Sequence, residues 1–525
     1  MKTNKLIVAS ALFAALAAFA YAEDAGSNSA DLFADSMADV PADSSAGNSS
    51  AAGAFKLTLS GEHGFAYHAP AYFSDDNGDY SGDIKKPVFT NDFGAEVQDG
   101  KVKLVSHWEF DVSPLDASAQ DPNGNWGASS SITPLENYVS WSPANLKLSA
   151  GYQIFSWGVA DKRNPTDNLN PRDYTTSAID PDKIPVLAAD ATWYPSDAVS
   201  LEGVFIPSKG ASQYPLDFTQ IIASKSEGLI PSGKLSYADN GADPEYFVAG
   251  AKLNYKSSAF DLSLDYLYDI DQYFTPEFSD IALNGIPTSP TYGLFLPASV
   301  TLERKRVQRI GGDAKTTIGK FGLWLETAYS LTDNSGAYDW SERKSKLDYT
   351  LGTDVNFGPN DVGYVNLQYI GTWIPDYDYD SPSKAMIAIL YGANASSAQE
   401  FYERSMVNLL GLETEGLLQG VTCNVKYEIA DALVTPQITA AFLKPFDYDD
   451  TSVTRYGSLA LNPEIDVKPV DSFHILIGAD LYYAWIKEDG GSVKLDTESD
   501  AVGSYTPSNN VYLKVVYKWN ADIKK

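Results

Sequence analysis

The chain has 525 residues, a formal net charge of −31 and 13% aromatic residues. The negative charge argues against nucleic-acid binding, because phosphate recognition requires clustered Lys and Arg. The single cysteine, Cys423, excludes an intrachain disulfide and argues against a cysteine-based metal site.

The first 54 residues predict export followed by a linker. Lys2 and Lys5 precede an apolar stretch, and Ala20-Tyr21-Ala22 fits the small-x-small cleavage rule, so residues 1–22 form a predicted signal peptide. An uncleaved anchor is the alternative, which the short apolar stretch disfavours. Residues 23–54 contain acids but no Lys or Arg. This composition cannot bury a core and predicts a disordered acidic periplasmic linker, with a plug inside the following domain as the alternative.

From residue 55 onward, apolar and polar residues alternate over segments of roughly ten residues, which is typical of membrane-spanning strands. Tight turns alternate with long polar loops, as in barrels whose short turns face the periplasm. Residues 55–525 are therefore predicted to be all-β: a transmembrane antiparallel up-and-down β-barrel of 18 strands, with 16 as the alternative. The predicted strands are 55–68, 87–98, 101–113, 134–142, 145–155, 186–194, 198–206, 245–256, 259–269, 305–318, 321–332, 345–358, 361–373, 415–428, 433–444, 456–468, 471–485 and 509–519.

Each predicted strand has one apolar and one polar face. In the last one, Val511, Leu513 and Val515 point one way, whereas Lys514 and Lys518 point the other. A barrel of this size encloses an aqueous lumen, which explains how the polar faces can carry charge. The residues predicted to line the lumen include Lys103, Glu109, Lys147, Gln153, Arg309, Asp313, Glu326, Asp354 and Lys426.

The loop after the fifth predicted strand is unusually basic for this chain and contains two Asn-Pro steps. We expect it to bend into the lumen and narrow it, with Lys162, Arg163 and Arg172 as the cations of a filter. The alternative is that Arg–Asp pairs fix the loop to itself. The predicted constriction residues are Trp157, Asp161, Lys162, Arg163, Asp167, Arg172 and Asp173.

This loop also carries a resemblance to a known family. Gly151-x-Gln153, Trp157-Gly158, Asp161, Asp167 and Asn170-Pro171-x-Asp173 resemble an uncharacterised family of Gram-negative outer-membrane β-barrels, a domain of unknown function near the alginate-export porins. The resemblance implies a large barrel with no assigned substrate. Alginate exporters have a lumen crowded with Arg, whereas here the predicted lumen mixes Lys and Arg with acids, which argues against export of a polyanion.

These features together predict a porin-like channel for small hydrophilic solutes in the outer membrane of a diderm bacterium. The barrel would contact outer-membrane lipid, and its C-terminal strand near Trp519 would be recognised by the barrel-assembly machinery. A surface adhesin or receptor that uses long acidic loops is the alternative. The oligomeric state stays open.

No cofactor, metal site or enzyme activity is predicted. The four histidines lack metal-ligand spacing, and the acidic runs at 75–83 and 376–380 lack the full spacing of a calcium loop. A hydrolase would need a nucleophile next to a base, and the sequence does not suggest such a pair.

Overall fold

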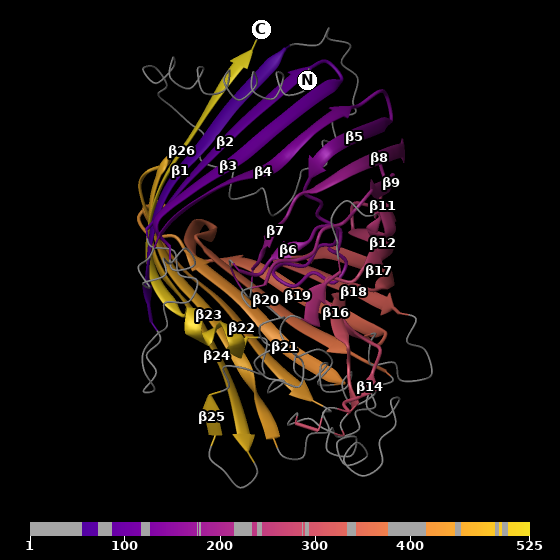
Figure 1. Cartoon of the computed structure of the whole chain (residues 1–525). Helices are drawn as coiled ribbons and strands as arrows, with labels where there is room; N and C mark the ends of the chain where they lie inside the picture. Colours follow the sequence, from indigo (N-terminus) through magenta and orange to yellow (C-terminus); the bar gives the residue numbers. More distant parts are fainter. Residues whose placement is uncertain are drawn as a thin grey trace.

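Eighteen long antiparallel strands form the wall of a closed barrel (Figure 1). The structure is a computed structural model, and it describes residues 55–71, 87–116, 127–175, 177, 180–214, 234–238, 244–285, 287–288, 293, 295–332, 343–375, 416–446, 453–488, 493–495 and 502–524. The predicted signal peptide and linker, and the acidic runs at 75–83 and 376–380, lie outside these residues.

The wall strands follow chain order around the ring. They are β1 (Lys56–Pro70), β2 (Val88–Asp99), β3 (Val102–Asp116), β4 (Gly127–Trp141), β5 (Leu146–Gln153), β8 (Val186–Ser196), β9 (Val199–Ile206), β11 (Val248–Lys256), β12 (Phe260–Ile270), β17 (Arg306–Ile318), β18 (Phe321–Leu331), β19 (Lys346–Phe357), β20 (Gly363–Trp373), β21 (Leu417–Tyr427), β22 (Val434–Phe446), β23 (Val453–Val470), β24 (Phe473–Glu488) and β26 (Asn510–Lys524).

Pairing of the first and last wall strands closes the ring. β1 and β26 pair from Lys56 with Lys524 to Pro70 with Asn510. The prediction of 18 strands is therefore confirmed, and the alternative of 16 is wrong. The last strand continues beyond its predicted end, because residues after Trp519 go on pairing with the start of β1; Thr58 Oγ1 donates to Asp522 Oδ1 at 2.7 Å.

The alternating sequence gives the wall an apolar outer face and a polar inner face. On β18, Leu325 is 49% exposed, whereas its neighbours Trp324 and Glu326 are 4% and 0% exposed. Exposed aromatic residues lie near both ends of the strands, for example Trp193 beside a short turn and Trp373 beside a long loop. Two aromatic girdles around an apolar band are typical of a membrane-spanning barrel.

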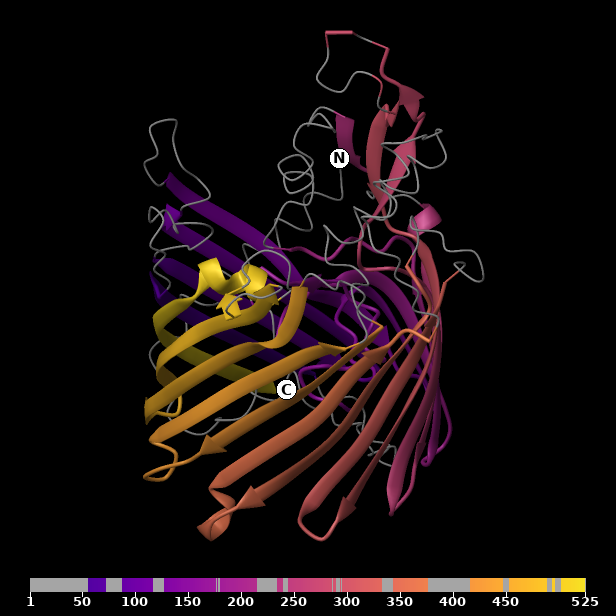
Figure 2. The ribbon, with the colours of Figure 1, turned by 90° about the horizontal axis from the view of Figure 1, so that it is seen from below.

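The two ends of the barrel differ. Figure 2 shows the tight turns gathered at one end of the barrel, and the connections between strands at the other end are longer in sequence. Gly100 and Gly319 adopt positive φ values of 58° and 65° in two of these turns, a conformation that glycine tolerates without steric cost. At the long-loop end, β10 (Leu235–Tyr237), β16 (Ser299–Glu303) and β13 (Thr275–Ser279) form a small sheet that projects from the barrel.

The remaining elements are short. The described residues also include β6 (Arg172–Asp173) paired with β7 (Asp182–Lys183), β14 (Ala282–Leu283) paired with β15 (Phe295–Leu296), β25 (Val493–Leu495) beside β24, and the 3-10 helices η3 (Pro244–Tyr246), η4 (Pro359–Asp361) and η5 (Gly503–Ser508). Within the described part of the chain, no helix has the length and apolarity needed to cross a bilayer.

Candidate functional site: a loop docked across the barrel lumen

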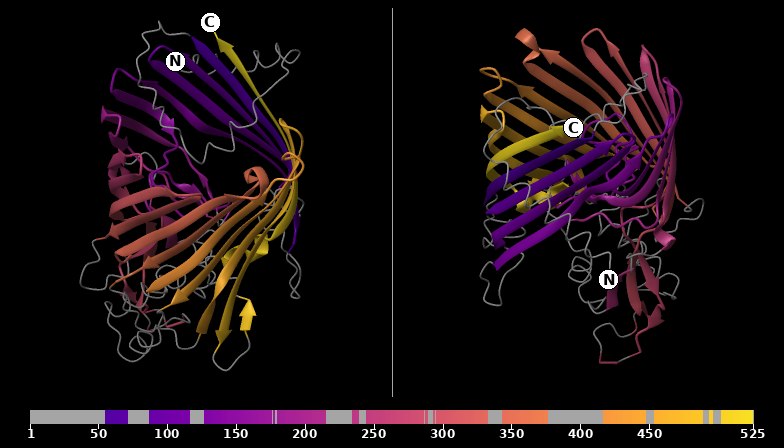
Figure 3. Two further views of the ribbon diagram at one scale, coloured as in Figure 1. Left: turned by 180° about the vertical axis from the view of Figure 1, so that it is seen from behind. Right: turned by 90° about the horizontal axis from the view of Figure 1, so that it is seen from above.

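The connection between β5 and β8 runs inside the ring and carries β6 and β7 (Figures 1 and 3). Its apolar residues Phe155, Trp157 and Leu169 pack against the inner face of the strands that follow it. Trp157 is 2% exposed and Leu169 is fully buried. Their partners on β8, β9, β11 and β12 are Val186, Ala188, Val204, Ile206, Val248 and Leu267. Because each such side chain contributes about 1.5–3 kcal/mol when it is buried, this cluster holds the first part of the loop against the wall.

Asn170 closes the base of the loop. Its Oδ1 accepts a hydrogen bond from the Phe155 N–H at 2.7 Å, and its Nδ2 donates to the Gln153 and Ile184 carbonyls at 3.1 and 2.9 Å. The side chain thus satisfies backbone groups on both arms of the loop that would otherwise be buried without a partner. This contact gives the Asn of the Asn170-Pro171-x-Asp173 motif a structural role.

Glu326 of β18 holds the tip of the loop. Its carboxylate accepts hydrogen bonds from the N–H groups of Val159, Ala160 and Thr166 at 2.8, 2.9 and 2.8 Å, and from the Thr166 hydroxyl at 2.9 Å. Backbone N–H groups that converge in this way form an anion-binding nest. A fully buried carboxylate is stabilised here by four donors, and we call this contact the Glu326 latch.

Beyond the latch, the loop reaches β19 and β20, which lie nearly opposite β5 in the ring. The Asp161 N–H donates to Gln368 Oε1 at 2.9 Å, and Asn366 Nδ2 donates to Asp161 Oδ2 at 3.1 Å. Arg163 donates to Thr372 Oγ1 at 2.7 Å and to Asp348 Oδ1 at 3.3 Å. The loop therefore extends inside the ring from β5 to β20 and covers the inner face of strands between them.

Carboxylates pair with the basic residues of the loop. Arg172 and Lys183 both contact Asp167 Oδ2, at 2.8 and 2.7 Å, Arg163 contacts Asp348, and Lys162 contacts Asp180. The loop thus bends inward and also forms the Arg–Asp pairs that the sequence left as the alternative. Asp173, in the short β6–β7 ladder, accepts from the Thr175 N–H at 2.9 Å.

The predicted lumen residues all lie on the inner face, because each alternates with exposed apolar residues of its strand. The structure separates them into two groups. Gln153, Arg309, Asp313 and Glu326 are at most 8% exposed. Lys103, Glu109, Lys147, Asp354 and Lys426 are half-buried or exposed. Asp313 and Glu326 are cross-strand neighbours, whereas the others are spread around the ring.

A buried ion cluster near the long-loop end was missed by sequence reasoning. Lys209 Nζ lies 2.7 Å from Asp269 Oδ1, and Arg309 Nε lies 3.1 Å from Asp269 Oδ2. Arg304 donates to the carbonyls of Lys209 and Gly210, both at 2.7 Å. Burial lowers the pKa of Lys209, and Asp269 opposes that shift. The alternation could place Arg309 and Asp269 on the inner face, but no local signal indicated that Lys209 of a loop would join them.

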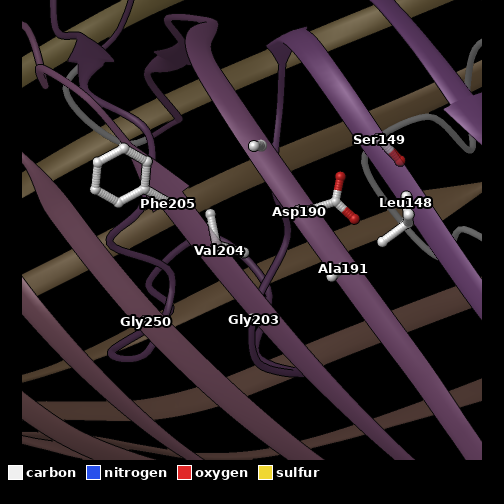
Figure 4. Close-up of a pocket in the computed structure, with 9 residues that line it drawn as sticks. Leu148, Ser149, Asp190, Ala191, Gly203, Val204, Phe205 and Gly250 are labelled. Carbon is white, nitrogen blue, oxygen red and sulfur yellow. The ribbon is translucent and has the colours of Figure 1, made fainter.

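Neither a metal site nor an enclosed pocket stands out in the described residues. No group of three or more His, Cys, Asp or Glu has metal-binding geometry there. A cavity of about 460 Å³ lies in the wall where Ala189, Ala191 and Gly203 leave space between larger neighbours; Asp190 and Ser149 also line it (Figure 4).

No model of a known protein family matches the chain, and no curated protein matches its sequence. Among solved structures, OccK5 (OpdH) of Pseudomonas aeruginosa is similar at a TM-score of 0.44 and 9% identity, covering 89% of this chain and 98% of that one. OccAB1 of Acinetobacter baumannii is similar at 0.46 and 9%, covering 89% and 97%. Wzi of Escherichia coli, a carbohydrate-binding β-barrel involved in group 1 capsule assembly, is similar at 0.40 and 11%, covering 89% and 85%. These likenesses are too distant to carry an argument about function, and the resemblance to the uncharacterised barrel family stays a prediction.

Proposed function

We propose that this protein is an outer-membrane channel for small hydrophilic solutes, narrowed by the loop between β5 and β8. The observation that carries the proposal is the docking of this loop on β18, β19 and β20 across a ring with a polar inner face. The inner faces of the strands that the loop does not reach would line the passage, except where η5 packs on Ala460 of β23 and Tyr482 of β24. In this role, the basic residues of the loop fix its position through their carboxylate partners.

Conductance of the purified, refolded protein in a planar bilayer tests the proposal. Discrete current steps are expected, together with passage of small sugars or amino acids into proteoliposomes. A protein whose folding is verified by heat-modifiable gel mobility, but which conducts no ions, would contradict the proposal. We also propose that the barrel-assembly machinery recognises the C-terminal strand. Replacement of Trp519 by Ala tests this proposal, because it should lower the yield of folded protein in cells.

The projecting sheet favours a second candidate, a surface adhesin or receptor. Phe274, Phe278, Val300 and Leu302 form a hydrophobic core of their own beneath this sheet, beyond the wall strands. A packed unit at the long-loop end offers a surface for contact with a partner. Replacing residues 275–303 with a short linker should abolish binding of cells to matrix proteins if the unit is an adhesin, and should leave conductance intact.

A further inference from the structure

The segment before the last wall strand folds onto the inner face of β24. β24 and β26 pair as far as Asp480 with Asn510, and Tyr482 lies two residues beyond this last pair. Polar side chains bind the Tyr482 backbone there: Asn509 Oδ1 accepts from its N–H at 2.6 Å, and the Thr506 hydroxyl donates to its carbonyl at 3.0 Å. Asn509 and Thr506 are fully buried, so these bonds satisfy buried polar groups and fix η5 to the inner wall.

Tyr505 of η5 joins this segment to the loop between β5 and β8. Its ring lies beside the ring of Tyr482, with centroids 5.2 Å apart, and its hydroxyl donates to the Tyr174 carbonyl at 2.8 Å. The Tyr174 side chain, next to β6, packs against the cluster that Tyr505 forms with Tyr482 and Ala460. Tyr505 is 9% exposed. Two segments that leave the wall at β5 and at β24 are therefore in direct contact inside the ring.

Further tyrosine rings continue this contact toward another part of the wall. The Tyr174 ring stacks on Tyr214 with centroids 5.1 Å apart, and the Tyr214 centroid lies 5.8 Å from that of Tyr273. Tyr273 follows the end of β12, and the Arg343 guanidinium lies 4.4 Å from its ring centroid. Aromatic pairs and a cation above a ring are favourable contacts, so these side chains hold together. We call Tyr273, Tyr214, Tyr174, Tyr505 and Tyr482 the tyrosine row.

The tyrosine row spans the ring between nearly opposite strands. β12 is the ninth and β24 the seventeenth of the 18 wall strands in ring order. A bridge between such strands divides the opening of a barrel in two. Strands that the β5–β8 loop leaves uncovered border each part: β26 and β1–β4 on one side of the row, and β21 and β22 on the other. Each part is narrower than the undivided ring, and the diameter of a pore limits the size of the solutes that pass.

We propose that Tyr505 is a specificity-determining residue of the channel, because its contact with Tyr174 sets the upper size of the solutes that pass. The proposal rests on the channel function proposed above and narrows its substrate class to hydrophilic solutes that fit one of two openings. A tyrosine hydroxyl donates and accepts hydrogen bonds without carrying a charge at neutral pH. The row therefore selects by size and not by the sign of a charge.

Swelling of proteoliposomes in sugars of different size tests the proposal. The ratio of the entry rate of the trisaccharide raffinose to that of the pentose arabinose measures the size limit. In Tyr505→Ala this ratio should rise at least about twofold, because the bridge is lost and the two openings join. η5 should stay on the wall, since Thr506 and Asn509 still bind the Tyr482 backbone. Tyr505→Phe keeps the ring but loses the hydrogen bond to Tyr174, so its ratio should lie between those of the wild type and Tyr505→Ala.

Tyr483→Ala is the matched control for Tyr505→Ala. Tyr483 is also a tyrosine of this part of the chain, but the alternation of β24 places it on the outer face, where its ring centroid lies 6.3 Å from that of Trp485. The substitution removes a ring of the same size without touching the tyrosine row. The ratio of the two entry rates should therefore equal that of the wild type.

The outcomes separate this proposal from the channel function. A channel that conducts, but whose ratio is unchanged in Tyr505→Ala or rises equally in Tyr483→Ala, overturns the size proposal and leaves the channel in place. Folded protein that neither conducts nor admits sugars overturns both. If Tyr505→Ala does not fold, Tyr505→Phe and Tyr174→Ala decide, since each weakens the same bridge, and an unchanged ratio in both variants overturns the size proposal.

Discussion

The inner wall of this barrel has two halves with the same sequence pattern and different surroundings. Across β8–β18, inner-face residues such as Ile206, Leu267 and Glu326 are at most 1% exposed, because the loop covers them. On β2 and β3, Glu96 and Lys103 form an ion pair whose side chains stay 36% and 38% exposed. One half thus resembles the packed core of a soluble domain, and the other a hydrated surface. Alternation decides which residues point inward, but a long-range contact decides whether they meet protein or water.

Substitution of Glu326 should have the largest effect on the contrast between the covered and the exposed parts of the inner wall. Glu326→Ala removes the carboxylate that accepts from the N–H groups of Val159, Ala160 and Thr166, and it leaves the Thr166 hydroxyl with Asn164 Oδ1 at 3.4 Å. Each buried donor left unsatisfied costs about 1–3 kcal/mol. The tip of the loop should leave the wall, and single-channel conductance should rise with larger current fluctuations. Added acetate should lower the conductance again, because it can occupy the same donors.

Glu464→Ala is the matched control for the latch. Glu464 of β23 is also a carboxylate of the inner face, but instead of the loop it binds Gln437 of the adjacent strand β22 at 2.6 Å and Tyr512 of β26 at 2.8 Å. Conductance of this variant should stay close to that of the wild type. If Glu326→Ala gave the same conductance as Glu464→Ala, the loop would be held without the latch.

Gly158→Ala should have the next largest effect. Gly158 adopts a φ of 89°, and an added Cβ would collide with Asn164 and with the Glu326 carboxylate. The left-handed backbone alone costs about 1–2 kcal/mol for a residue with a side chain. Conductance should rise, although less than in Glu326→Ala, and limited proteolysis should cut the loop faster. Gly210→Ala meets open space and has no positive φ, so it is the control; equal behaviour of the two variants would contradict a tight fit at Gly158.

Arg163→Met should have a smaller effect. The Arg163 side chain is 35% exposed, and Asp348 keeps a second partner in Lys346 at 3.2 Å. Partly solvated ion pairs contribute about 0–1 kcal/mol, so the loop should stay docked. The reversal potential should move little, because Lys346 still neutralises Asp348 after the substitution. A large shift of the reversal potential toward cation selectivity would instead show that Arg163 acts as a cation of the filter.

The smallest expected effect concerns pH. Burial raises the pKa of Asp161, and Lys162 opposes the shift. The docked state therefore holds a proton more readily than the undocked state, so docking strengthens as the pH falls through this raised pKa. Acidification from neutral pH should reduce current fluctuations in the wild type. Asp161→Asn should remove this part of the pH response, and a response that persists would assign it to other carboxylates.

The strand pattern was readable from sequence because it depends on neighbours two residues apart. The turn at Gly100 and the alternation around Leu325 each carry a local signal, so all 18 wall strands could be placed. The inward course of the loop was expected from its composition. The residue that anchors the loop could not be predicted, because the sequence around Glu326 does not distinguish it from Asp354, which also lies on the inner face. A contact between a carboxylate and backbone N–H groups more than 150 residues away does not change the periodicity of the sequence, so the sequence pattern cannot reveal it.

The separation between the loop and its anchors sets an order for biogenesis. Val159 binds a residue 167 positions later in the chain, and Arg163 binds one 209 positions later. If hairpins join the growing wall in chain order, the loop has no docking partner until β18–β20 arrive. Contacts between such distant segments form late in folding, because the intervening chain must first be ordered. A barrel halted midway through insertion would therefore be leakier than the finished one, which gives the cell a reason to complete or degrade it quickly.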